Sequence, residues 1–202
     1  MYNPSLHPQV RYSLEAMTKG LFFFLQSSPL EKITVSQICA QAGLTRRTFY
    51  RNCEKKEDLI LYACDRLIEE QLSEVDFSSR DAEALYCHFF AFWEAHRQFL
   101  SAIFQYGFFK QFVDRYVGLC SERMHFPLQD SASEESRDTR LFRYFSDSFL
   151  LGGLSRMLYA WNEEDFCFSA KEMARTILFL VPVPDNISLA SGNPAGTDRS
   201  LF

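Results

Sequence analysis

The sequence predicts an all-α protein with two helical parts. Through most of the 202 residues apolar side chains recur every three or four positions, which is the spacing of one helix face. Few segments alternate with the period of two that a half-buried strand requires. Breaks rich in Ser, Pro, Gly and Asn separate the helical stretches. We therefore divide the chain into a small domain over 1–60, a larger helical domain over 61–182, and a flexible tail over 183–202.

The breaks also predict the individual helices. In the first part a helix should run over about 8–27 and end before Pro29, and two short helices should flank Gly43. A long helix over about 56–74 should then leave the first domain for the second. The remaining helices are expected near 81–97, 99–105, 108–125, 138–161 and 169–181.

The first of the two short helices has a clear start and end. Thr34 and Gln37 have the spacing of a capping box, in which each side chain bonds the other residue's backbone N–H. The helix should therefore start at Val35. Gly43 should end it, because glycine adopts a left-handed backbone at little cost and lets the chain reverse into the next helix.

The second short helix carries the candidate functional groups. Thr45 is a natural N-cap, and Leu44 and Phe49 supply a buried anchor. The exposed positions are expected to be Arg46, Arg47, Thr48, Tyr50, Arg51 and Asn52. Arg reads guanine in the major groove, and the other polar types commonly bond phosphate oxygens. This pattern favours a DNA-binding helix-turn-helix; a solvated basic surface is the alternative.

This segment resembles the DNA-binding domain of the tetracycline-repressor (TetR/AcrR) family of bacterial regulators. The family pattern has a Thr-initiated helix, an Ala-Gly turn, a Thr-Phe-Tyr core and a Lys-Glu-aliphatic start to the fourth helix. Residues that match it are Thr34, Ala42, Gly43, Thr48, Phe49, Tyr50, Lys56, Glu57 and Leu59. Two positions depart from it: Cys53 is a smaller core residue than usual, and Lys55 replaces the usual helix cap.

The resemblance implies roles for individual residues. Arg46 and Arg47 would face bases, and Ser36 would lie at the rim of the contact. Thr48, Tyr50, Asn52 and Lys56 would hold the DNA backbone, and Lys55 would place a charge near phosphate. With the cap residue included, the candidate DNA-binding set is Ser36, Thr45, Arg46, Arg47, Thr48, Tyr50, Asn52, Lys55 and Lys56.

Charge is distributed unevenly along the chain. Residues 1–60 hold eight Lys and Arg against five Asp and Glu, giving +3, and the rest of the chain is at −8, consistent with the net −5. A local basic surface can bind DNA on an acidic protein. The six cysteines form no CxxC pair, the first ten residues hold two prolines and polar residues, and no apolar run is long enough for a membrane span. We expect a cytoplasmic protein.

Aromatic residues are concentrated in the second part, with 17 of the 21 phenylalanines after residue 60. An aromatic excess can line a ligand cavity. The residues where the TetR-like family has its effector pocket are Trp93, Phe99, Phe104, Phe108, Phe109, Phe112 and Tyr116, with Tyr106 in the same run. Such a pocket would suit an apolar or cationic ligand. The alternative is that these rings simply pack into a core.

Catalytic and metal-binding patterns are weak. His88 and His96 could share a helix face, with Cys120 and His125 elsewhere in the chain, but the spacing fits no usual zinc framework. The chain has no nucleophile elbow, phosphate loop or dinucleotide-binding glycine pattern. We expect no enzyme activity, no cofactor and no metal.

Residues 147–181 give the strongest signal in the second part. Gly152 and Gly153 weaken a helix by about 1 kcal/mol each relative to Ala, so close helix approach is their expected use. The segment resembles the last two helices of a C-terminal domain common in TetR-like regulators of low-GC Gram-positive bacteria, which pair with their copies in a second subunit. The implied dimer interface is Phe142, Phe145, Phe149, Gly152, Gly153, Arg156, Met173, Ile177 and Leu180. The alternative is that the glycines are buried within one protomer.

Together these resemblances imply a homodimeric transcriptional regulator, most often a repressor in this family. It would bind double-stranded DNA at a pseudo-palindromic operator, and an unknown small-molecule effector would release it. The alternative is the same fold controlled by a partner protein. A metal or enzyme role based on the histidines is a third hypothesis.

Overall fold

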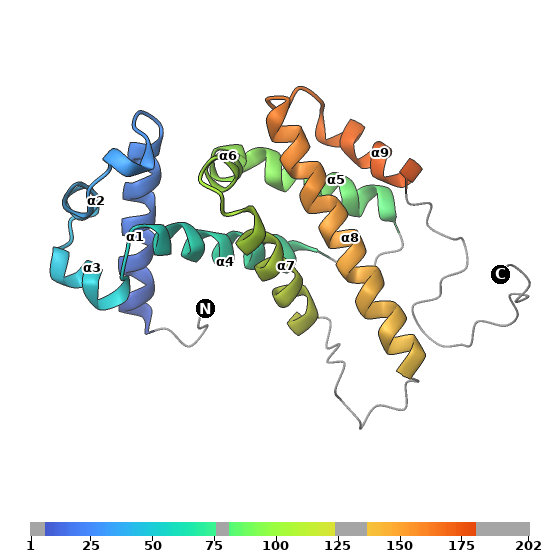
Figure 1. Cartoon of the computed structure of the whole chain (residues 1–202), viewed down its shortest axis with the longest axis horizontal. Helices are drawn as coiled ribbons and strands as arrows, with labels where there is room; N and C mark the ends of the chain where they lie inside the picture. The colour runs from blue at the N-terminus through green and yellow to red at the C-terminus, as the bar shows by residue number, and fades with distance from the viewer. Residues whose placement is uncertain (1–6, 76–80, 124–136, 181–202) are drawn as a thin grey trace, which may run out of the picture.

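The computed structural model describes residues 7–75, 81–123 and 137–180, and within these ranges all regular structure is helical (Figure 1). The predicted all-α class is confirmed for this part of the chain. The elements are α1 (Pro8–Leu25), η1 (Leu30–Lys32), α2 (Val35–Gln41), α3 (Arg46–Asn52), α4 (Glu57–Glu74), α5 (Ala82–Ala95), α6 (Arg97–Gln105), α7 (Phe109–Arg123), α8 (Arg137–Glu163) and α9 (Ala170–Leu180). The predicted tail over 183–202 lies outside the described residues.

The first three helices fold through local signals and a compact apolar core. The Thr34–Gln37 capping box is present at the start of α2, and Gly43 has a φ of 65° where the chain turns toward α3. Gly20 allows α1 and α2 to approach, because a Cβ there would lie 3.1 Å from the Ile38 carbonyl oxygen. Phe49 of α3 is fully buried in this core, as predicted.

The start of α4 has a substitute for the missing cap. Lys56 precedes the helix and makes no side-chain cap hydrogen bond. Instead the Asp58 carboxylate accepts hydrogen bonds from the backbone N–H groups of Glu54 (2.8 Å) and Lys55 (3.1 Å). The carboxylate also lies in the first turn, where the helix dipole favours negative charge.

The second part packs α5 against α9, and α8 against α6 and α7 (Figure 1). Its core contains many ring contacts, including the edge-on approach of Trp93 to Phe112, with centroids 5.2 Å apart. Trp161 of α8 meets Phe90 of α5 in the same way at 5.8 Å. Such edge-to-face pairs are favoured by the charge distribution of the rings.

Two polar contacts attach α7 to α4. Arg115 donates through Nη1 to both carboxylate oxygens of Asp65, at 2.8 and 3.1 Å, and Asp65 is almost completely buried. One residue further along α7, the Tyr116 hydroxyl donates to the amide oxygen of Gln71, also buried. Burial raises the pKa of Tyr116 well above its ordinary value, so the hydroxyl stays protonated. The long helix is therefore fixed to the second part.

Arg115→Met should lower the free energy of unfolding by about 3 kcal/mol, because it leaves the Asp65 carboxylate buried without its partner. The matched control is Lys110→Met on the same helix, where the Lys110–Asp114 ion pair is exposed and should contribute less than about 1 kcal/mol. Urea denaturation followed by circular dichroism measures both. Equal losses in the two variants would contradict a structural role for the buried pair.

Candidate nucleic-acid interface

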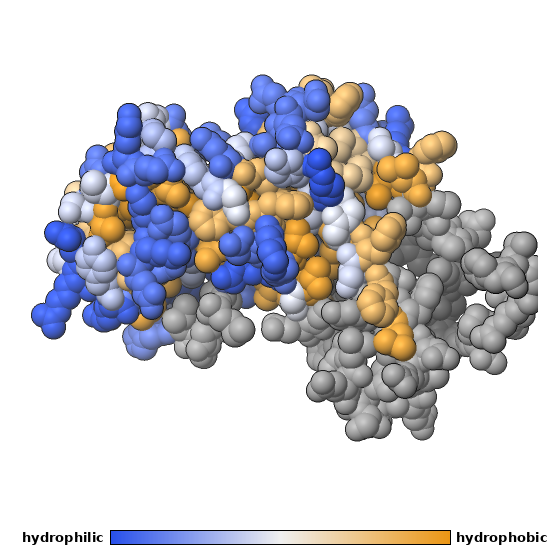
Figure 2. Space-filling view, in the orientation of Figure 1, coloured by the Kyte–Doolittle hydropathy of each residue, from blue (hydrophilic) through white to orange (hydrophobic). Residues whose placement is uncertain are grey.

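Helix α3 presents its basic side chains outward. The Thr45 side chain caps the helix by accepting from the Thr48 N–H at 3.2 Å, which fixes the orientation of the first turn. Arg46 and Arg47 are both exposed, as predicted. Figure 2 shows hydrophilic side chains gathered over the end of the molecule formed by α1, α2 and α3.

The exposed side chains of α3 form two adjacent columns at i, i+4 spacing. In one column the Arg46 guanidinium lies 5.9 Å from the centroid of the exposed Tyr50 ring. The other column holds Arg47 and Arg51, both exposed. Within the described residues, no ion pair with a carboxylate engages these three arginines. Their charges are available to an anionic partner.

The other predicted DNA-contacting residues differ in how available they are. Ser36, Thr45 and Lys55 are exposed, whereas Thr48 and Asn52 are half-buried. The Asn52 amide nitrogen donates to the Thr48 carbonyl oxygen at 2.9 Å. That amide nitrogen is thus engaged within its own helix, while the two hydroxyls of Thr45 and Thr48 share a hydrogen bond at 3.1 Å.

The ammonium of Lys56, predicted to contact the DNA backbone, is engaged within the protein. Its ammonium donates to the carbonyl oxygens of Leu30 and Ile33, the latter at 2.9 Å, and lies 3.4 Å from that of Glu31. These carbonyls belong to η1 and the residue that follows it, 23 to 26 positions earlier in the chain. Lys56 therefore joins α4 to η1. A sequence pattern of local spacing does not reveal such a distant partner.

Cys53 at the end of α3 has a packing role. It is buried at the C-cap, where the family-like pattern has a larger side chain. Burial is the main cause that raises its pKa, to about 12, and burial also raises the pKa of Cys39. Both thiols therefore stay neutral near pH 7.

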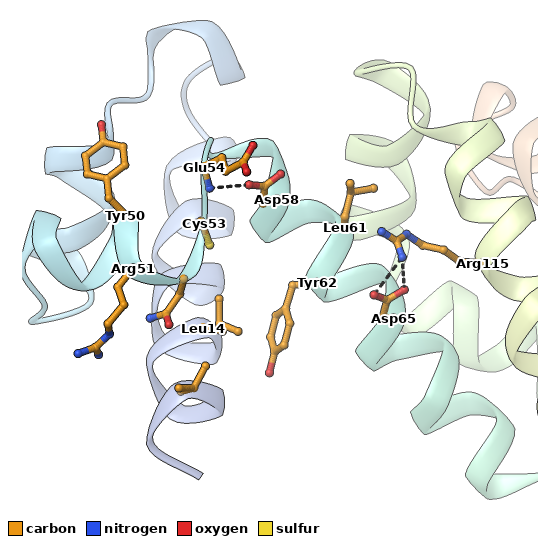
Figure 3. A pocket seen from close by; sticks show the side chains of 12 residues that line it. Leu14, Tyr50, Arg51, Cys53, Glu54, Asp58, Leu61, Tyr62, Asp65 and Arg115 are labelled. Carbon is orange, nitrogen blue, oxygen red and sulfur yellow. Dashed lines mark hydrogen bonds and ion pairs between the residues drawn. The ribbon is translucent and has the colours of Figure 1, made fainter. Parts of the chain in front are cut away.

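A cleft of about 750 Å³ separates the end of α3 from α7 (Figure 3). One wall contains Arg51 and Cys53, and the opposite wall contains the Asp65–Arg115 ion pair. Tyr62 of α4 lies between these walls. The cleft borders both the basic helix and the second part of the protein.

The rings predicted to line an effector pocket are mostly buried against one another. Five of the seven rings are buried, and Trp93, Phe112 and Tyr116 contact one another with centroids 5.2 to 6.2 Å apart. Phe104 and Phe109 are partly buried and both meet Tyr159. These rings fill a core, which was the alternative, because Trp and Phe side chains from α5, α6 and α7 converge there. Phe99 also borders a second cavity, between α1, α4 and α6.

Tyr106 has a role that the aromatic pattern did not predict. Its hydroxyl accepts a hydrogen bond from the Leu30 N–H at 3.1 Å, and so connects the end of α6 with η1. The sequence signal for this contact is the hydroxyl itself, because most of the neighbouring aromatic residues are phenylalanines, which have no polar atom.

The histidines make separate contacts. His88 Nε2 lies 3.5 Å from a Glu74 carboxylate oxygen, and His96 Nδ1 lies 2.8 Å from the Phe92 carbonyl oxygen. Among the described residues, no group of three His, Cys, Asp or Glu side chains is arranged to hold a metal ion.

The predicted dimer interface separates into exposed and buried residues. Phe145, Phe149 (74% exposed), Arg156 and Leu180 lie at the surface, and Figure 2 shows apolar residues along the visible side of α8. A Cβ on Gly152 or Gly153 would meet no atom of the described residues within 4 Å, so these glycines make no close approach to the described part of the protomer. The side chain of Phe142 lies outside the described residues.

Two members of the predicted interface are not exposed in the protomer. Met173 and Ile177 are buried in the core of the protomer, on the helix that packs against α5. The large apolar side chains exposed on α9 are Phe179, which is 87% exposed, and Leu180. The helical period was predicted correctly, but the apolar positions on α9 are divided between its two faces.

No protein-family model matches the chain, and no curated protein matches it. None of the described helices is both long and apolar enough to pass through a lipid bilayer. Any functional proposal therefore depends on the arrangement of the residues described above.

Lys56→Met should lower the free energy of unfolding by about 2 kcal/mol, because the buried carbonyls of η1 lose a charged hydrogen-bond donor. The neighbouring Lys55→Met is the matched control; its exposed side chain should change stability by less than about 0.5 kcal/mol. Thermal and urea denaturation measure the difference. Equal stability in the two variants would mean that these hydrogen bonds contribute little and that the Lys56 ammonium is available to DNA.

Proposed function

We propose that the protein is a homodimeric TetR-type transcriptional regulator that binds double-stranded DNA through α3. The exposed arginine columns of this short helix carry the proposal. They extend from a helix that the Thr45 cap and the buried Phe49 hold in place. Arg side chains on such a rod can reach base edges in the major groove.

The exposed apolar residues of α8 and α9 support dimer formation. Phe145, Phe149, Phe179 and Leu180 present apolar surface to water in the isolated chain, and Gly152 and Gly153 leave space for a close neighbour. A twofold pair buries the same patch from both copies. Two copies of α3 would then enter successive major grooves, roughly 34 to 36 Å apart.

In this proposal the regulator acts as a repressor, and an effector releases it from a pseudo-palindromic operator. The effector favours a protomer conformation in which the two copies of α3 no longer match the groove spacing. Its effect can be no larger than its difference in affinity for the two conformations.

Arg47→Ala should weaken binding to the preferred operator about tenfold or more while changing non-specific binding much less, because a base contact is lost. Lys171→Ala, on the exposed side of α9 far from α3 in the sequence, removes the same charge and is the control. Fluorescence anisotropy with DNA flanking the protein's own gene, at several salt concentrations, measures both. Absence of a salt-dependent, sequence-preferring complex with the wild type would rule the proposal out.

Phe149→Glu should convert the dimer to a monomer, because it places a charge in the apolar interface. Phe23→Glu changes an exposed phenylalanine on α1 and should leave the dimer intact. Sedimentation equilibrium gives the mass of each variant. A monomeric wild type would contradict the dimer, and a different protein bound at the α8 surface would favour control by a partner.

A further inference from the structure

A second pocket, of about 400 Å³, lies where α1, α4 and α6 meet. Its walls are mainly apolar and include the rings of Phe22, Tyr62 and Phe99.

The charged residues at this pocket balance one another. Glu15 and Glu70 supply two negative charges, and Lys19 and Arg66 supply two positive ones. Arg66 contacts Glu15 at 4.0 Å and Glu69 at 3.2 Å, so its charge is already compensated by the protein. A charged ligand gains little from such a set, whereas an uncharged apolar one gains from the rings.

We propose that this pocket binds an uncharged, apolar small molecule about the size of two or three aromatic rings, and that it is the effector site of the regulator. The volume and the aromatic lining fall within the range of small-molecule sites, which often lie between domains. The role of the pocket as an effector site rests on the proposed function. The binding of an apolar molecule rests only on the volume and the lining of the pocket.

The position of the pocket explains how its occupant controls α3. The Phe22 and Phe99 rings meet with centroids 5.8 Å apart, and this contact joins α1 of the DNA-reading part to α6 of the second part. A ligand packed against both rings changes that contact. The change reaches α3 through the shared core of α1, Ile38 and Phe49. By reciprocity, bound DNA changes the affinity for the ligand by the same factor.

The test uses N-phenyl-1-naphthylamine, an uncharged apolar fluorophore, titrated into the full-length protein. The wild type should bind one molecule per chain with enhanced fluorescence. Leu67→Trp fills the pocket from α4 and should weaken binding about tenfold or more. Leu61→Trp is the matched control, a half-buried leucine of the same helix that borders the other cleft, and should change binding less than about twofold.

Ala63→Leu fills the same pocket from another position of α4 and gives a second variant if Leu67→Trp fails to fold. Each variant is checked by circular dichroism, and operator affinity is measured with and without the fluorophore. Bound fluorophore should lower the operator affinity of the wild type several-fold but not that of the folded pocket-filling variant.

The outcomes separate the two proposals. No fluorophore binding, or equal binding by the Leu67 and Leu61 variants, overturns the pocket while leaving the DNA-binding proposal intact. Fluorophore binding that Leu67→Trp abolishes, in a protein that forms no specific DNA complex, supports the pocket and overturns the proposed function. Binding at the pocket with no change in operator affinity overturns its role as effector site.

Discussion

The attachment of α1, α2 and α3 to the rest of the protein depends on hydrogen bonds on both sides of Leu30. Its N–H donates to the Tyr106 hydroxyl of α6, and its carbonyl oxygen accepts from the Lys56 ammonium at the start of α4. Backbone polar groups in a buried segment must be paired. Within the turn the Leu30 carbonyl oxygen accepts from the Ile33 N–H at 3.1 Å. The two distant side chains add partners from outside the turn and join both parts of the chain to it.

The sequence predicted the local features of the fold well. The caps at Thr34 and Thr45 and the turn at Gly43 each depend only on residues within four positions of the cap or turn itself. Helical periodicity likewise depends on neighbouring residues, so the predicted helix boundaries fall close to the observed ones. Exposure of Arg46 and Arg47 followed from the same reasoning, because the buried side of α3 was fixed by Phe49.

The contacts that the sequence did not reveal are those that depend on distant partners. Lys56 donates hydrogen bonds to carbonyl oxygens more than 20 residues earlier in the chain. Trp93 of α5 packs against Phe112 of α7, and the sequence alone does not show that these two helices are neighbours. Met173 and Ile177 share an apolar stripe with exposed residues, and periodicity alone does not say which side meets α5. The pocket between α1, α4 and α6 joins three separated segments, so no spacing in the chain indicates it.

Tyr62 borders both cavities, the cleft beside α3 and the pocket beside α6. A shift of this one side chain therefore changes the shape of both cavities. If an occupant of one cavity moves the Tyr62 ring, it alters the affinity of the other cavity, and the occupant of the other cavity acts back on the first by the same factor.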